Sequence, residues 1–97
     1  MASFFIMSHF VYILYSESLD MFYKGQTKNL SDRIMRHNMN QEKATQNGSP
    51  WTLVWSTKKP TRSSAMILER KLKNLSRKRL IDFILKHPEG VASPDDP

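Results

Sequence analysis

The sequence of 97 residues contains no cysteine and three glycines, and these shortages exclude several kinds of protein. Without cysteine there is no disulfide framework, no thiolate zinc site and no cysteine nucleophile, which is typical of a cytosolic protein. The mostly apolar run from Phe4 to Tyr15 is shorter than the roughly 20 residues that a membrane-spanning helix needs. It also lacks the basic leader and the cleavage site of a secretory signal. We therefore expect a cytoplasmic protein without a membrane partner.

Acidic residues are scarce relative to basic ones. Fifteen Lys and Arg against nine Asp and Glu give a net charge of +6, and three of the nine acids lie in the last ten residues. The stretch from Lys58 to Arg79 contains one acid, Glu69, among nine bases. So basic a segment is either a solubilising surface or a nucleic-acid-binding surface. Glu69 itself is either a salt-bridge partner, for example of Lys73, or a metal ligand.

The length of the chain favours one compact domain, because about 100 residues do not supply two separate cores. We expect residues 1–8 to form an N-terminal arm and residues 9–87 to form the folded domain. Residues 88–97 contain three prolines and little apolar surface, so they are expected to be a disordered tail.

Residue patterns predict three strands and three helices. β-Branched and aromatic residues favour strands near 10–15, 21–26 and 51–56, and the short gap after the first favours a hairpin. Asn29, Thr61 and Ser76 are expected to cap three helices, and Pro88 ends the last. The order is β-β-α-β-α-α, so we expect an α+β fold with a three-stranded antiparallel sheet flanked by helices.

Four side chains in the first half of the chain are candidates for chemistry. A hairpin symmetric about residues 17 and 18 would place Tyr12 directly opposite Tyr23 on the same face of the sheet. Arg33 and His37 are four residues apart in the first predicted helix, so they share one helix face, expected to lie away from the apolar stripe.

The order of these residues resembles the GIY-YIG nuclease superfamily, in particular its small single-domain bacterial members and the N-terminal catalytic domain found in an excinuclease. Phe10-Val11-Tyr12 stands where the family has Gly-Ile-Tyr, and Tyr23-Lys24-Gly25 stands where it has Tyr-Ile-Gly. A Gly-x-Thr sequence, an Arg-x-x-x-His helix and a glutamate in a later helix follow in the same order. The resemblance covers about residues 9–85.

The resemblance implies an endonuclease that hydrolyses DNA phosphodiester bonds, in DNA repair or recombination. By this resemblance, Glu69 would hold one divalent cation, Mg²⁺ or Mn²⁺. Tyr12 would help to activate the attacking water, with Tyr23 beside it. Arg33 would stabilise the phosphate in the transition state, and His37 would hydrogen-bond the phosphate or the nucleophile. Gly25 is expected to let the chain turn closely beside the site.

Further basic side chains are candidates for contacts with backbone phosphates: Lys28, Arg36, Lys58, Lys59, Arg62, Lys73, Arg77 and Lys78. Such contacts would give a salt-sensitive affinity for DNA that is independent of sequence, and RNA is not excluded. We expect a monomer or a weak dimer. Two other interpretations stay open: a non-catalytic nucleic-acid-binding module that retains the fold, and a small interaction subunit whose basic face binds an acidic protein.

Overall fold

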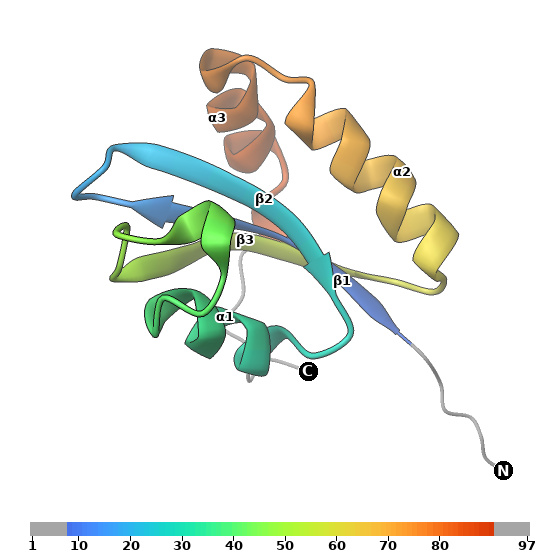
Figure 1. The fold of residues 1–97 in the computed structure, drawn as a ribbon. Helices are drawn as coiled ribbons and strands as arrows, with labels where there is room; N and C mark the ends of the chain where they lie inside the picture. The colour runs from blue at the N-terminus through green and yellow to red at the C-terminus, as the bar shows by residue number, and fades with distance from the viewer. Residues whose placement is uncertain (1–7, 91–97) are drawn as a thin grey trace, which may run out of the picture.

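A three-stranded antiparallel sheet with helices on both sides forms the fold (Figure 1). The computed structural model describes residues 8–90, so most of the expected N-terminal arm lies outside the described residues. The predicted α+β fold and its order β-β-α-β-α-α are confirmed, with two short 3-10 helices added. In chain order the elements are β1 (His9–Ser16), β2 (Met21–Thr27), α1 (Leu30–Asn38), η2 (Lys43–Thr45), β3 (Trp51–Lys59), α2 (Arg62–Lys73), α3 (Arg77–Lys86) and η3 (Pro88–Gly90).

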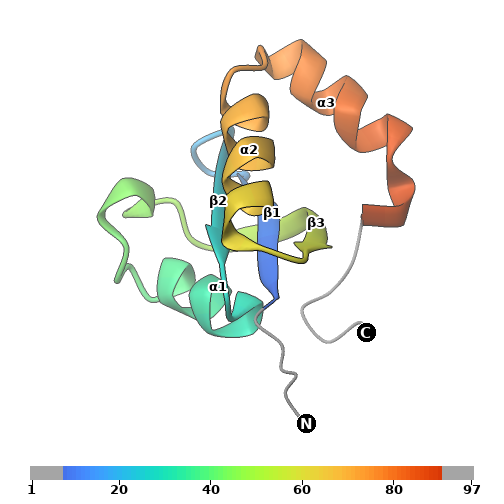
Figure 2. The same ribbon diagram turned by 90° about the vertical axis from the view of Figure 1, so that its right-hand side faces the viewer.

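The central strand β1 separates two buried clusters, because the sheet order is β2-β1-β3. Val11 and Ile13 pack with side chains of α2 and α3. Tyr12 and Leu14, which alternate with them, pack with Leu30 of α1. Accordingly, α1 lies on one side of the sheet and α2 and α3 lie on the other (Figure 1), and in Figure 2 the strands lie between α1 and α3.

The register of the β1–β2 hairpin differs from the predicted one. Tyr12 lies opposite Gly25, and Tyr23 lies opposite Leu14, so the two tyrosines are not directly opposite each other. The difference is a shift of two residues, which leaves every side chain on its expected face. Tyr12 and Tyr23 are therefore diagonal neighbours, with ring centroids 6.2 Å apart.

Gly25 lies inside β2, which corrects the expectation that it forms a turn. No glycine within residues 8–90 has a positive φ, so the backbone conformation does not explain why a glycine occupies position 25. A Cβ atom at this position would lie 2.6 Å from the Tyr12 hydroxyl oxygen and 2.9 Å from the Tyr23 ring. The missing side chain thus makes room for the tyrosines.

The helices begin where their caps predict. Asn29, Thr61 and Ser76 each accept a hydrogen bond from the backbone N–H three residues later. A cap of this kind contributes about 1 kcal/mol to stability. None of the helices within residues 8–90 is long and apolar enough to cross a membrane.

The chain remains ordered beyond the expected domain end. Pro88–Gly90 belongs to the segment expected to be a disordered tail, but it forms η3. Gly90 is buried against the Trp55 indole, whose Nε1 donates a hydrogen bond to the His87 carbonyl oxygen at 2.9 Å. η3 therefore closes one end of the core on the α2 and α3 side. The rest of the expected tail lies outside the described residues.

Candidate active site

Tyr12, Tyr23 and His37 form an aromatic cluster between the sheet and α1. The Tyr23 ring centroid lies 4.9 Å from that of His37, and the Tyr12 centroid lies 5.8 Å from that of His37. The Tyr12 hydroxyl oxygen and Nε2 of His37 are 2.9 Å apart, a hydrogen-bonding distance. The fold thus brings together three of the residues singled out in the sequence.

The position of His37 on α1 differs from the expected one. Leu30, Ile34 and His37 follow one another at spacings of four and three residues, which places them on one helix face. Leu30 and Ile34 pack against the sheet, and His37 continues their stripe and is fully buried. Arg33 lies at the edge of this stripe, with 34% of its side chain exposed.

A second partner of His37 comes from η2. The Thr45 hydroxyl oxygen lies 2.7 Å from Nδ1 of His37, and Thr45 is almost fully buried. The sequence analysis missed Thr45, because one threonine in a polar segment without a motif carries no signal of its own. The segment after α1 therefore contributes to the cluster.

Glu42, just before η2, links two arginines of α1. Its Oε2 atom lies 2.8 Å from Nε of Arg36 and 3.7 Å from Nε of Arg33. The hydrogen bond from Arg36, together with both guanidinium charges, lowers the pKa of the Glu42 carboxyl. Glu42 is therefore ionised at neutral pH and holds Arg33 beside the tyrosines.

Burial sets the charge of the cluster. Burial raises the pKa of Tyr12, Tyr23 raises it further, and the neighbouring Arg33 guanidinium opposes the rise. Burial lowers the pKa of His37, and the charges of Arg33 and Arg36 lower it too, whereas Glu42 raises it. At neutral pH the cluster thus contains a protonated phenol next to a neutral imidazole, which can accept its proton.

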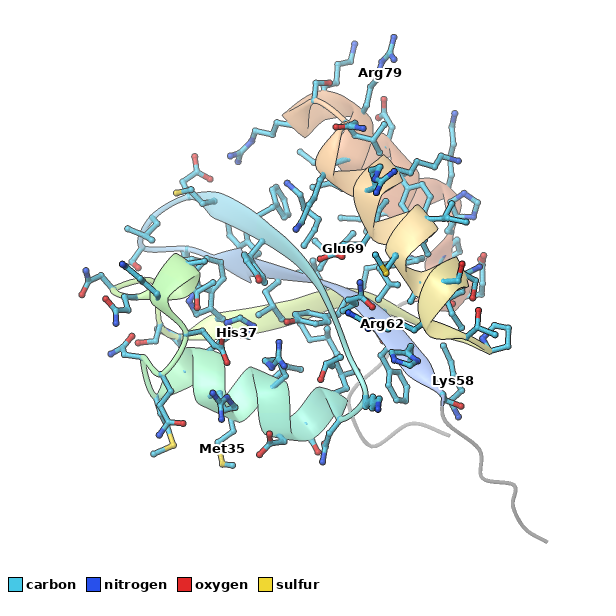
Figure 3. The ribbon with its side chains drawn as sticks, turned by 45° about the vertical axis from the view of Figure 1, so that its right-hand side comes forward. Met35, His37, Lys58, Arg62, Glu69 and Arg79 are labelled. Carbon is cyan, nitrogen blue, oxygen red and sulfur yellow. The ribbon has the colours of Figure 1, made fainter. Side chains whose placement is uncertain are left out.

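Glu69 lies on α2, on the side of the sheet opposite to α1, and points toward β2 (Figure 3). Its Oε1 atom accepts a hydrogen bond from Nε2 of Gln26 at 2.9 Å, and its Oε2 atom lies 3.1 Å from Nζ of Lys73. The salt bridge to Lys73 that the sequence left open is therefore present. The side chain of Glu69 is 17% exposed, so it does not extend into solvent.

Charged side chains on both sides of the sheet influence the pKa of Tyr23. Burial raises its pKa most, Lys73 lowers it, and Glu69 raises it from the α2 side. Two smaller effects on the same pKa oppose each other, since Arg33 lowers it and Glu42 raises it. Because β2 is an edge strand, these side chains can approach Tyr23 around its open edge. The Glu69 carboxylate thus influences the pKa of Tyr23 from the α2 side of the sheet.

The residues present fit a divalent cation held by one carboxylate. Magnesium keeps several waters and commonly binds through one or two carboxylates and substrate phosphates. Glu69 supplies a partly accessible carboxylate. Within residues 8–90 there is no group of three or more histidines and acids that could enclose a metal ion. A cation bound here would therefore take its remaining ligands from water and substrate oxygens.

The expected phosphate-binding side chains fall into two groups. Three of them form ion pairs: Arg36, Lys73 and Arg77. Arg77 binds the Asp20 carboxylate at 2.7 Å and the Asp20 carbonyl oxygen at 2.9 Å, so it ties α3 to the β1–β2 turn. The others make no ion pair within residues 8–90: Lys28, Lys58, Lys59, Arg62 and Lys78.

Comparison with known proteins supports the same family. A family model described as the GIY-YIG catalytic domain matches residues 8–82. Among solved structures, the chain is similar to a UPF0213 protein from Bacillus halodurans, determined by NMR in solution, with 32% sequence identity and a TM-score of 0.54. This match covers 80% of the present chain and 83% of the Bacillus chain. No protein with a curated description matches the chain.

Proposed function

Since this chain belongs to the GIY-YIG catalytic-domain family, we propose that it is a divalent-metal-dependent endonuclease that hydrolyses DNA phosphodiester bonds. The observation that carries the proposal is the convergence of Tyr12, Tyr23 and His37 in one cluster with Arg33 at its edge. An apolar cluster would fill the same space without the cost of burying polar groups. A catalytic role gives a reason for that cost.

Tyr12 and His37 are assigned the role of activating the attacking water. A protonated phenol must lose its proton before it can act as a base, and the neutral imidazole of His37 lies 2.9 Å away. As the Tyr12 proton passes to Nε2 of His37, the Tyr12 oxygen accepts a proton from the water. The water oxygen attacks phosphorus, and the bond from phosphorus to the leaving oxygen breaks, with the bonding electrons staying on that oxygen. Tyr23, which contacts both rings, holds the hydroxyl in place.

Arg33 is assigned to the phosphate. Its guanidinium is partly exposed and close enough to the Tyr12 hydroxyl to oppose the rise of its pKa. A planar, permanently charged fork is suited to the negative charge that develops on the phosphate oxygens in the transition state. Glu42 keeps this fork oriented from the side of η2.

Glu69 would hold the cation, Mg²⁺ or Mn²⁺, after its carboxylate has moved away from Lys73. A bound cation would supply neutralisation of charge on the leaving oxygen. Gln26, which donates a hydrogen bond to the other oxygen of Glu69, would keep the carboxylate aimed at the edge of β2.

The nucleic acid would be bound through its backbone. Basic side chains without an ion pair in the described residues would contact phosphates, so binding would weaken steeply with salt and depend little on sequence. We place this activity in the cytoplasm of a bacterium, in DNA repair or recombination, with the protein acting as a monomer or a weak dimer. RNA presents the same backbone phosphates and would be a second ligand of this surface.

Cleavage assays test the proposal. Labelled branched, nicked and duplex DNA would be incubated with the protein, with and without Mg²⁺ or Mn²⁺. We expect metal-dependent cleavage, which Glu69→Gln abolishes while DNA binding remains. Asp82→Asn is the matched control, since it removes a carboxylate from α3, and it should cleave as the unmodified protein does.

The ion pair between Glu69 and Lys73 favours one alternative, a non-catalytic nucleic-acid-binding module, because it satisfies the carboxylate without a metal. Salt-sensitive binding without cleavage at any metal concentration would support this alternative. Absence of salt-sensitive binding would contradict both and favour an interaction subunit with an acidic protein partner.

A further inference from the structure

A chain of buried hydrogen bonds leads from η2 through His37 to Tyr12. The Thr45 hydroxyl donates to the Glu42 carbonyl oxygen at 3.3 Å, and its oxygen lies 2.7 Å from Nδ1 of His37. The other ring nitrogen of His37, Nε2, lies 2.9 Å from the Tyr12 hydroxyl. Thr45 and His37 are buried, at 1% and 0% exposure, so bulk water cannot replace a missing partner of Nδ1.

Two arrangements of the hydrogens are conceivable, because a neutral imidazole carries its proton on either nitrogen. With the proton on Nδ1, His37 donates to Thr45, Thr45 donates to the Glu42 carbonyl, and Tyr12 donates to Nε2. With the proton on Nε2, Thr45 must donate to Nδ1. The Glu42 carbonyl then loses this bond, and the Tyr12 hydrogen loses His37 as its acceptor. The Glu42 carbonyl still accepts the backbone N–H of Thr45 at 3.1 Å, so the cost of the second arrangement falls on the Tyr12 hydroxyl hydrogen, which has no acceptor. The first arrangement satisfies all three contacts, and leaving a buried polar group unpaired costs free energy.

We propose that Thr45 is a positioning residue that holds the proton of His37 on Nδ1, so that Nε2 is free to accept the proton of Tyr12. The consequence for catalysis rests on the proposed function. The location of the proton on His37 is independent of the proposed function, because it follows from the hydrogen bonds within the protein alone.

The surroundings of Thr45 make it a rigid support. Its backbone carbonyl accepts hydrogen bonds from Nε1 of Trp51 at 3.0 Å and from the backbone N–H of Gly48 at 3.3 Å. The Gly48 carbonyl in turn accepts a hydrogen bond from the buried Ser16 hydroxyl of β1 at 2.6 Å. Because η2 is fixed to the sheet at these points, the Thr45 hydroxyl has little freedom to turn away from His37.

The direct test is the ¹⁵N NMR spectrum of the His37 ring in the metal-free, DNA-free protein. We expect a protonated Nδ1 and an unprotonated Nε2 at neutral pH. Thr45→Val keeps the side-chain shape and removes the hydroxyl, so it should shift the ring toward a mixture of both forms. Thr45→Ser should restore the original signals, and Thr52→Val, at an exposed position of β3, should leave them unchanged. A protonated Nε2 in the unmodified protein, or His37 signals unaltered in Thr45→Val, would overturn the inference.

Cleavage supplies the second readout. Thr45→Val should slow single-turnover cleavage by about 10- to 100-fold, by analogy with the loss when the hydrogen-bond partner of a metal-ligating histidine is removed. Thr45→Ser should recover most of the rate, and DNA affinity should be the same in all three proteins. Equal rates in Thr45→Val and the unmodified protein would contradict the inference. If the unmodified protein does not cleave DNA, the proposed function fails, and the NMR spectrum of that protein still decides where the His37 proton lies.

Discussion

The two sides of the sheet are built from alternate residues of one strand, yet they differ in kind. On the side of α2 and α3, Val11 and Ile13 join an apolar cluster in which, within residues 8–90, Trp55 is the one core residue with a polar side-chain atom. On the side of α1, Tyr12 leads into a buried chain of hydrogen bonds through His37 to Thr45. A step of one residue along β1 therefore changes the environment from apolar packing to a polar site.

This difference indicates that the two clusters have different roles, one in stability and one in cleavage. Two helices of 12 and 10 residues cover the apolar side, whereas one helix of 9 residues covers the polar side. We expect substitutions among the apolar core residues to act mainly on stability, and substitutions in the hydrogen-bonded cluster to act mainly on cleavage. Glu69, although it lies on α2, belongs with the second group. The following changes test whether the two sides are separable.

The largest effect on stability is expected for Leu72→Ala on the apolar side. Leu72 is fully buried between α2 and the sheet, so the change leaves a cavity and should lower the free energy of unfolding by about 2–5 kcal/mol. Urea denaturation measures this loss. Under conditions where the variant is folded, it should cleave DNA at the normal rate. A folded Leu72→Ala protein with a large catalytic defect would break the proposed separation.

A smaller effect is expected for a pair of glycine substitutions, one on each side. Gly25→Ala would push a methyl group against the Tyr12 ring, whereas Gly90→Ala would push one against the Trp55 indole. Each should cost about 1–3 kcal/mol of unfolding free energy through overpacking. Cleavage by the folded proteins distinguishes them, since Gly25→Ala alone should reduce it strongly. An equal loss of cleavage in both variants would show that the two sides do not act separately.

The smallest effect is expected in the pH dependence of stability. Burial lowers the pKa of His37 in the folded protein, so as the pH falls below about 6.5 the unfolded chain takes up a proton that the folded one does not. The free energy of unfolding should therefore decrease as the pH is lowered through this range. His37 should contribute at most about 1.4 kcal/mol per pH unit to this decrease. Denaturation curves between pH 7 and 5 should show the slope in Leu72→Ala and a reduced slope in His37→Gln. Identical slopes in these two variants would contradict the burial of a neutral His37.

Much of this arrangement could be predicted from local patterns in the sequence. The apolar and aromatic run from Phe10 to Tyr15 predicts the buried central strand, and the caps at Asn29 and Thr61 predict where α1 and α2 begin. These predictions succeed because each depends on residues close together in the chain. The order of the site residues, read through the family resemblance, also identified the aromatic cluster.

The hairpin register depends on contacts that no local pattern reveals. β1 and β2 are joined by residues 17–20, and Asp20 has a φ of 53°. Its carboxylate accepts hydrogen bonds from Tyr15 and from Arg77, which lies 57 residues away in the chain. The partners of the site are equally remote, since Gln26 meets Glu69 only after α2 has folded over the sheet. Likewise, the spacing of His37 from Ile34 becomes informative only once the buried face of α1 is known.

Single-turnover DNA cleavage by Tyr12→Phe, compared with Tyr15→Phe, tests the central claim most directly. Both variants remove a hydroxyl from β1, but Tyr12 bonds to His37, whereas Tyr15 bonds to Asp20 at the hairpin turn. The account predicts that Tyr12→Phe cleaves about 10²- to 10⁴-fold more slowly, with DNA binding retained, because the general base is lost. Tyr15→Phe should cleave at the normal rate. Cleavage by Tyr12→Phe as fast as by the unmodified protein would contradict the account.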